Sequence, residues 1–231
     1  MTDSTHGGHA HGSHGHGSHA HEDPSFDKGY WEEHWTTGDS ARRSPSDTVP
    51  NPWLVREIGD RTPGTALDAG CGTGTEAIWL AERGWQVTGV DISSAALELA
   101  EERASQASVS QLVSWVEADL TTWQPDGQFD LVATHYAHAT MPQLAFYKRI
   151  AEWVAPGGTL LIVGHLPDPE GVPETDATPT DATVTARDII AVLSPVAWHI
   201  DLAEEKVRQI DRADGSVLEL HDVIVRATRI E

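Results

Sequence analysis

Short apolar runs alternate along the chain with stretches in which apolar residues recur every three or four positions. The first pattern is typical of buried strands and the second of amphipathic helices. The apolar runs predict strands at Thr65–Ala69, Trp85–Asp91, Leu112–Ala118, Phe129–His135, Thr159–His165, Trp198–Ile210 and Val217–Thr228. The amphipathic stretches predict helices at Trp53–Ile58, Thr75–Arg83, Pro142–Val154 and Ala186–Leu193, with a further helix beginning after Ser93 or Ser94.

Strands and helices alternate over most of this pattern, and only the last two strands follow each other directly. This order is typical of an α/β fold with a mainly parallel sheet and an antiparallel edge region. In the helix after Ser93, we expect Ala96, Leu99, Ala100 and Arg103 to lie on one face. The segment Pro167–Thr183 is rich in Pro, Asp and Thr and is predicted to be a long loop, of a kind that is usually functional or mobile.

The N-terminal segment has no apolar periodicity and is dominated by histidine, glycine and serine. Its histidines are His6, His9, His11, His14, His16, His19 and His21. We therefore expect a disordered tail over residues 1–28 and one folded domain over residues 29–231. Two interpretations of the tail stay open. It binds nickel or zinc loosely as its function, or it is a solvated segment that takes up metal only when metal is offered.

The charge of the chain is strongly negative, with 15 Lys and Arg against 36 Asp and Glu and a net charge of −21. Such a surface repels nucleic-acid phosphates and anionic membranes, so we expect neither as a partner. No apolar run approaches the ~20 residues of a membrane span, and the N-terminus lacks an apolar signal core. The lone Cys71 excludes an internal disulfide framework. These features together predict a cytoplasmic location.

A glycine-rich turn follows the first strand and opens the next helix. Its glycines, Gly70, Gly72 and Gly74, are spaced G-x-G-x-G and let a ligand approach the backbone closely. The dinucleotide fingerprint G-x-G-x-x-G would need glycine where Thr75 stands. This spacing disfavours a nicotinamide-dependent oxidoreductase without excluding one.

Acidic residues stand at the ends of the next two strands. Asp91 could accept hydrogen bonds from both hydroxyls of a ribose, or it could cap the helix that starts near Ser93. Asp119 could accept from an adenine amino group, or it could be a solvated loop residue. The glycine turn and Asp91 together predict a site for an adenosine-containing ligand.

The order of five segments resembles that of the class I S-adenosylmethionine-dependent methyltransferases. The segments are LDAGCGTG at 67–74, VTGVDIS at 87–93, VEADL at 116–120, FDLVATH at 129–135 and APGG at 155–158. The resemblance implies a Rossmann-like three-layer sandwich whose seven-stranded sheet has the order 3-2-1-4-5-7-6, with strand 7 antiparallel. It also implies transfer of a methyl group from S-adenosylmethionine to an O, N, S or chalcogen atom of a small molecule.

The same resemblance implies roles for individual residues. Gly70, Gly72 and Gly74 would face the methionine and ribose part of the donor, and Asp68 would lie near its amino group. Asp91 would hold the ribose, Ile92 would pack on the adenine, and Asp119 with Leu120 would flank that ring. His135 would adjoin the donor as well.

An aromatic segment upstream resembles the N-terminal lid of small-molecule methyltransferases near the thiopurine and tellurite-resistance groups. Trp35 could lie over the donor's sulfonium, where a cation–π contact contributes ~0.5–2 kcal/mol. Tyr30 and Trp31 would then contact the methyl acceptor. The alternative is that these rings form an amphipathic helix packed on the core.

Histidines at strand ends are the candidates for proton transfer. In the implied topology His135 and His165 end neighbouring strands, and His221 lies beside them at the edge where ligands bind. Tyr136 and His138 follow on the adjoining loop. We expect His135 and His165 to be catalytic bases, and Tyr136, His138 and His221 to line the acceptor pocket. Alternatives are purely local hydrogen bonding and a metal site made of these imidazoles.

The chain has no separate substrate domain, which favours a small acceptor and a monomer or homodimer. A metal-binding or carrier protein that acts through the histidine-rich tail is the alternative from another functional class.

Overall fold

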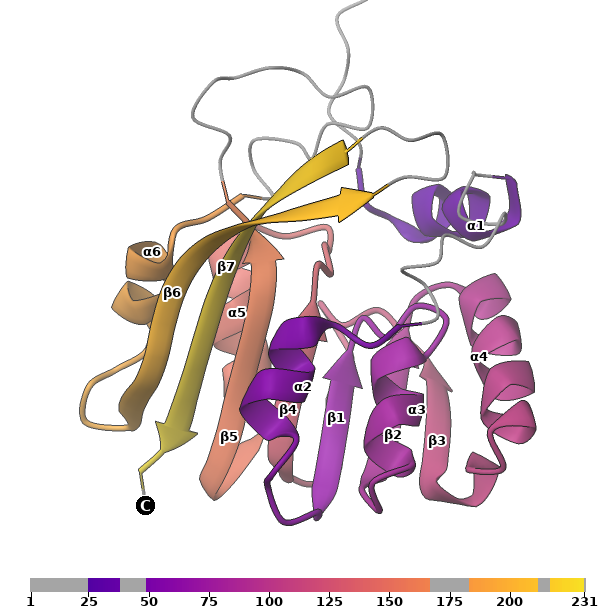
Figure 1. The fold of residues 1–231 in the computed structure, drawn as a ribbon, viewed down its shortest axis with the longest axis horizontal. Helices are drawn as coiled ribbons and strands as arrows, with labels where there is room; N and C mark the ends of the chain where they lie inside the picture. Colours follow the sequence, from indigo (N-terminus) through magenta and orange to yellow (C-terminus); the bar gives the residue numbers. More distant parts are fainter. Residues whose placement is uncertain (1–24, 38–48, 167–182, 212–216, 231) are drawn as a thin grey trace, which may run out of the picture.

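The computed structural model describes residues 25–37, 49–166, 183–211 and 217–230. Within them the strands form one seven-stranded sheet in the order β3-β2-β1-β4-β5-β7-β6 (Figure 1). The strands are β1 (Thr65–Ala69), β2 (Gln86–Asp91), β3 (Val113–Glu117), β4 (Phe129–His135), β5 (Val154–His165), β6 (Trp198–Asp211) and β7 (Val217–Arg229). β7 pairs antiparallel with β5 and β6, whereas β1 to β5 pair in parallel. The predicted fold class is confirmed. The histidine-rich segment and most of the predicted long loop lie outside the described residues.

Helices cover both faces of the sheet, which gives the three layers. One face carries α2 (Pro52–Ile58), α3 (Thr75–Ala81) and α4 (Ser94–Gln106), and the other carries α5 (Gln143–Ala151) and α6 (Ala186–Val192). A single 3-10 turn, Ser110–Leu112, precedes β3. The helix α1 (Lys28–Thr37) lies apart from these layers, at the end to which the parallel strands point (Figure 1). No helix in the described part of the chain is long and apolar enough to cross a membrane.

Successive residues of the central strands pack into opposite cores. Leu160 and Ile162 of β5 face the core under α5 and α6, and Leu161 and Val163 face the core under α2 and α3. All four are completely buried. A strand covered on both faces is apolar at every position, which is why these strands appear in the sequence as unbroken apolar runs.

Two details of the prediction were wrong. β5 begins at Val154 rather than Thr159, because Val154 already pairs with Phe129 before the pairing shifts register at the glycine turn and resumes at Thr159. In α4 the buried face carries Leu97, whereas Leu99 is 37% exposed. The helix therefore lies on the sheet rotated toward Leu97 from the predicted face.

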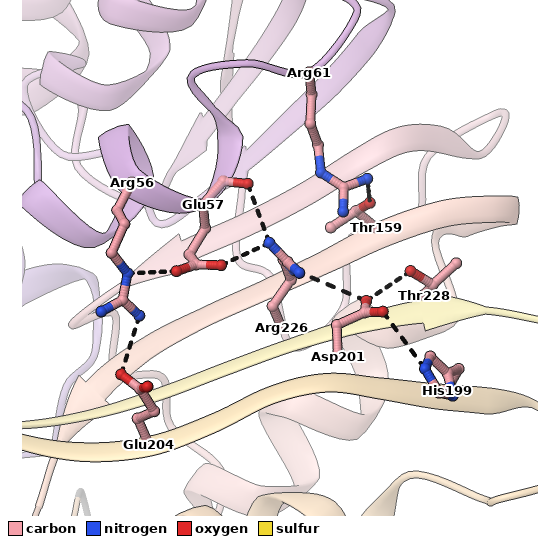
Figure 2. A network of polar contacts seen from close by, with 9 residues as sticks. All are labelled: Arg56, Glu57, Arg61, Thr159, His199, Asp201, Glu204, Arg226 and Thr228. Carbon is pink, nitrogen blue, oxygen red and sulfur yellow. Dashed lines mark hydrogen bonds and ion pairs between the residues drawn. The ribbon is translucent and has the colours of Figure 1, made fainter.

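A chain of polar contacts ties the β6–β7 hairpin to α2 (Figure 2). Arg226 of β7 donates to Glu57 of α2 over 2.6 Å and lies 3.8 Å from Asp201 of β6. Thr228 also donates to Asp201, over 2.7 Å. Arg56 of α2 forms ion pairs with Glu57 and with Glu204 of β6. The hairpin runs past the ends of the other strands (Figure 1). Its contacts with α2 therefore hold the projecting end of the hairpin in place relative to the sheet.

Candidate functional site

The glycine turn between β1 and α3 is tightly packed by two other segments. Gly70 and Gly72 have φ angles of 78° and 49°, which side-chain-bearing residues rarely adopt. A Cβ on Gly70 would stand 2.3 Å from Ala137, and one on Gly72 would stand 3.0 Å from the ring of Trp35. The turn therefore meets both the loop after β4 and the helix α1. Gly74 has a left-handed φ of 76° as well, and a Cβ there would also collide with Trp115.

Asp91, at the end of β2, is buried and joins the glycine turn to α4. The Gly72 amide donates to one carboxylate oxygen over 2.8 Å, and the Ser93 amide donates to the other over 3.0 Å. The N-cap of α4 is Ser93, whose hydroxyl accepts from Ala96. Burial raises the pKa of Asp91, and the two amide bonds partly offset that rise. Each oxygen keeps a second lone pair, so Asp91 can still accept from ligand hydroxyls.

Beside Asp91 lies an open cavity of about 390 Å³, a volume suited to a small ligand. It is lined by Asp27, Lys28, Ile92, Glu117, Ala118, Asp119 and Thr140. The predicted adenine-contacting residues Ile92 and Asp119 thus share one cavity. Leu120 does not line it, because its side chain belongs to the hydrophobic core. An ion pair between Lys28 and Glu117 brings the start of α1 to the rim.

A cluster of ionisable groups is buried beneath the glycine turn. Nδ1 of His135 lies 3.9 Å from Oδ1 of Asp68, and the Asn51 amide donates to the Glu76 carboxylate over 3.0 Å. Burial raises the pKa of Glu76. Within the described residues, neither ring nitrogen of His135 nor Oδ2 of Asp68 has a hydrogen-bond partner. Buried polar atoms without partners call for an explanation, and a ligand bearing an ammonium group would satisfy the carboxylate.

Of the three histidines predicted to converge, His221 lies on the opposite face of the sheet from the other two. His135 points toward Asp68, and its pairing with Val163 puts it on the same face of the sheet as His165. His221 precedes Asp222 on β7, and successive side chains of a strand point to opposite faces, so His221 lies on the face opposite to Asp222 and His165. Which histidines meet depends on the face of the sheet to which each side chain points. The position of a histidine at the end of a strand does not reveal that face.

Other rings predicted for the pocket do come together. The ring centre of His165 lies 4.6 Å from that of Tyr136 and 5.7 Å from that of His138. The ring centre of Phe26, just before α1, lies 5.1 Å from that of His138, with the two rings tilted to each other. Burial and repulsion from a protonated His138 lower the pKa of His165 to about 4. His165 is therefore neutral near pH 7 and a weak base.

The carboxylate of Asp222 is a site residue that the sequence reasoning missed. It is fully buried and accepts from the Tyr136 hydroxyl over 2.7 Å, from Nε of Arg208 over 2.6 Å and from the Trp53 indole over 2.7 Å. Arg208 also donates to the Tyr136 hydroxyl, over 3.0 Å. Burial and the nearby Asp222 raise the pKa of Tyr136 far above its ordinary value. An acid directly before the apolar run Val223–Val225 was the signal that could have revealed it.

Tyr136 has an unusual backbone within this cluster. Its φ angle is 54°, which is uncommon for a non-glycine residue. Its hydroxyl is fixed by Asp222 and Arg208. These hydrogen bonds offset the energetic cost of the unusual backbone conformation.

The helix α1 is held on α4 by Glu32, in addition to the Lys28–Glu117 ion pair and the contact of Trp35 with the glycine turn. Glu32 accepts from the amide and hydroxyl of Ser94, both over 2.8 Å, and from the Ser93 hydroxyl. It thereby places an anion at the N-terminus of α4, a favourable position for negative charge. No residue of α1 is buried, so the alternative of an amphipathic helix packed on the core is wrong. Tyr30 and Trp31 contact each other and Phe26.

Comparison with known proteins decides between the functional classes. A family model described as a methyltransferase domain matches residues 66–158. Thiocyanate methyltransferase 1 of Brassica oleracea is 30% identical over 200 residues, which cover 82% of each protein. The chain belongs to the class I S-adenosylmethionine-dependent methyltransferases. It is thus a methyltransferase enzyme that uses S-adenosylmethionine, and the nicotinamide alternative receives no support.

Two further proteins are similar to this methyltransferase. A probable thiol methyltransferase 2 of Arabidopsis thaliana is 30% identical over 141 residues, or 58% of this chain and 60% of that protein. The N-methyltransferase NodS of Bradyrhizobium japonicum, solved with S-adenosylhomocysteine, superposes with a TM-score of 0.62 at 18% identity, covering 88% and 98% of the two chains. The second likeness concerns the fold alone.

The residues of this methyltransferase fit its methyl donor. Asp91 and the glycine turn would hold the ribose, and the cavity with Ile92 and Asp119 would take the adenine. The unpartnered oxygen of Asp68 suits the ammonium of the methionine part. When bound, the donor supplies an electrophilic methyl group. The chain's own contribution would be to hold the acceptor in line with that methyl group.

Proposed function

We propose that this methyltransferase methylates the sulfur atom of a small thiol. The observation that carries the proposal is the similarity to the thiocyanate methyltransferase, which spans most of both proteins. The shorter match to a probable thiol methyltransferase points to the same kind of acceptor.

The chemistry of the ring cluster supports a soft, weakly charged acceptor. Phe26, Tyr136, His138 and His165 form a wall of aromatic rings in which His165 is uncharged near neutral pH. Sulfur packs favourably at aromatic edges, where each contact contributes ~0.3–1.5 kcal/mol. The positive charge of Arg208 is balanced by Asp222, which disfavours acceptors that need a free cation.

We expect thiols to be the best acceptors in a panel of small molecules. Formation of S-adenosylhomocysteine would be measured with 2-mercaptoethanol, thiophenol, thiocyanate, catechol, histamine and selenite. The kcat/KM of the thiols should be at least about tenfold higher than that of catechol and histamine, because methyl transfer is fastest for the acceptor that the pocket orients best. A phenol or an amine as the preferred acceptor would refute the thiol assignment and leave the methyltransferase activity standing.

We also propose that the histidine-rich tail binds nickel or zinc loosely. The proposal rests on the sequence, because these histidines lie outside the described residues. Imidazole binds metal in its neutral form, so affinity should fall as the pH drops below about 6. Titration calorimetry of Ni²⁺ into the full chain should show this loss, and deletion of residues 1–21 should abolish binding. The affinity for S-adenosylmethionine should be the same with and without the tail. A loss of donor binding on deletion would contradict the prediction that the tail is independent of the donor site.

We infer from the net charge of −21 that neither nucleic acid nor an anionic membrane is a partner. A cytoplasmic location and a monomeric or homodimeric state remain predictions.

A further inference from the structure

The loop after β4 holds a histidine whose protonated nitrogen is fixed by its neighbours. Nδ1 of His138 lies 3.1 Å from Oε1 of Gln143. The amide nitrogen of Gln143 donates to the Ala137 carbonyl over 2.9 Å. A carbonyl only accepts, so the amide nitrogen of Gln143 must face Ala137 and its oxygen must face His138. That oxygen in turn only accepts, so Nδ1 of His138 carries the hydrogen.

The neutral ring of His138 therefore presents Nε2 as its basic nitrogen. Gln143 is buried at the start of α5, so the orientation that it imposes is rigid. The ring itself contacts the rings of Phe26 and His165. In the described part of the chain no hydrogen bond engages Nε2.

We propose that Nε2 of His138 accepts the acceptor's proton during methyl transfer and that Gln143 is the positioning residue for this base. The inference rests on the proposed thiol acceptor for its preferred substrate. In the step, a bond forms between the thiol sulfur and the methyl carbon. The bond from that carbon to the donor's sulfonium breaks, its electron pair stays on the donor's sulfur, and the S–H proton passes to Nε2.

The surroundings of the ring favour His138 over the other histidines as the base. The titratable and charged groups on this side of the site are His165 from β5, Tyr136 after β4, Arg208 from β6 and Asp222 from β7. Tyr136, Arg208 and Asp222 are bonded to one another, and His165 has a pKa of about 4. Burial lowers the pKa of His138, and the bond to Gln143 opposes that shift. His138 is thus neutral near pH 7 and able to take a proton.

Turnover of two different acceptors distinguishes a catalytic role of His138 as a base from a role in packing alone. 2-Mercaptoethanol carries a proton that must leave, whereas thiocyanate carries none. An alkyl thiol is mostly protonated at pH 7, because even at a cysteine-like pKa of ~8.5 only ~3% of it is thiolate. His138→Ala should therefore lower turnover of 2-mercaptoethanol by about tenfold to thirtyfold at pH 7, with recovery toward pH 9. Turnover of thiocyanate should stay within about twofold, and His199→Ala, at an exposed histidine of β6, should change neither. Equal loss with both acceptors would overturn the proposal.

Gln143 variants test the positioning role through the pH profile. An acceptor opposite Nδ1 stabilises the protonated ring, and a carboxylate does so more strongly. Gln143→Leu should shift the ascending limb of the rate to lower pH, and Gln143→Glu should shift it to higher pH. Rates that fall without a shift in either variant would mean that Gln143 only packs, which contradicts its assigned role.

The tautomer gives a test that needs no acceptor. Long-range ¹H–¹⁵N spectra of the labelled wild-type enzyme should show His138 protonated at Nδ1 near pH 7. Protonation at Nε2 instead would overturn the proposal, whatever the substrate. If the wild type methylates neither sulfur compound, the thiol assignment fails, and the spectrum still decides the state of His138.

Discussion

Asp222→Ala is expected to lower the free energy of unfolding by about 3–5 kcal/mol, the cost of removing one partner from a buried ion pair. The carboxylate is completely buried and receives bonds from Tyr136, Arg208 and Trp53. Its removal leaves a guanidinium, a hydroxyl and an indole N–H without their acceptor. The melting temperature should fall by about 10 °C, measured by differential scanning calorimetry.

Asp201→Ala is the matched control for this variant. Asp201 also pairs with an arginine of the β6–β7 hairpin, but it is partly exposed and lies in the network of Figure 2. Its loss should cost only about 1 kcal/mol, because water replaces part of the lost interaction. Equal effects of the two substitutions would show that Asp222 is no more than one hairpin contact among others.

Asp91→Ala is expected to weaken binding of S-adenosylhomocysteine at least about a hundredfold. Two charge-assisted hydrogen bonds to the ribose would be lost, each worth ~1.5–3 kcal/mol, and ~1.4 kcal/mol corresponds to a tenfold change in affinity. The variant also loses the bonds from the Gly72 and Ser93 amides, so some loss of thermal stability should accompany the weaker binding. Titration calorimetry measures the affinity directly.

A modified ligand shows whether Asp91→Ala weakens binding by loss of a direct contact with the ribose or by displacement of the glycine turn. Removing the ribose 2′-hydroxyl from S-adenosylhomocysteine should weaken binding to the wild type and have little further effect on Asp91→Ala. Asp126→Ala, an exposed residue of the loop before β4, should bind like the wild type. Unchanged affinity in a folded Asp91→Ala protein would remove Asp91 from the donor site.

The sequence predicted the meeting of the glycine turn and Asp91 better than the meetings among the rings and histidines. The glycine turn and Asp91 stand at the ends of neighbouring parallel strands, so their meeting follows from strand order alone. The meetings among the rings and histidines depend on the direction of each side chain. His135 and Tyr136 are adjacent in sequence, yet one faces Asp68 and the other faces Asp222.

What the sequence by itself determined is local: the strands, most of the helices and the turn chemistry of the glycine loop. These depend on periodicity and on backbone conformations set by neighbouring residues. Only the tertiary structure decided which distant side chains share a site. The hydroxyl of Tyr136 meets a carboxylate 86 residues away, and the indole of Trp53 meets the same group across 169 residues. Those contacts require the register of β7 beside β5, and a shift of one residue would turn Asp222 to the opposite face.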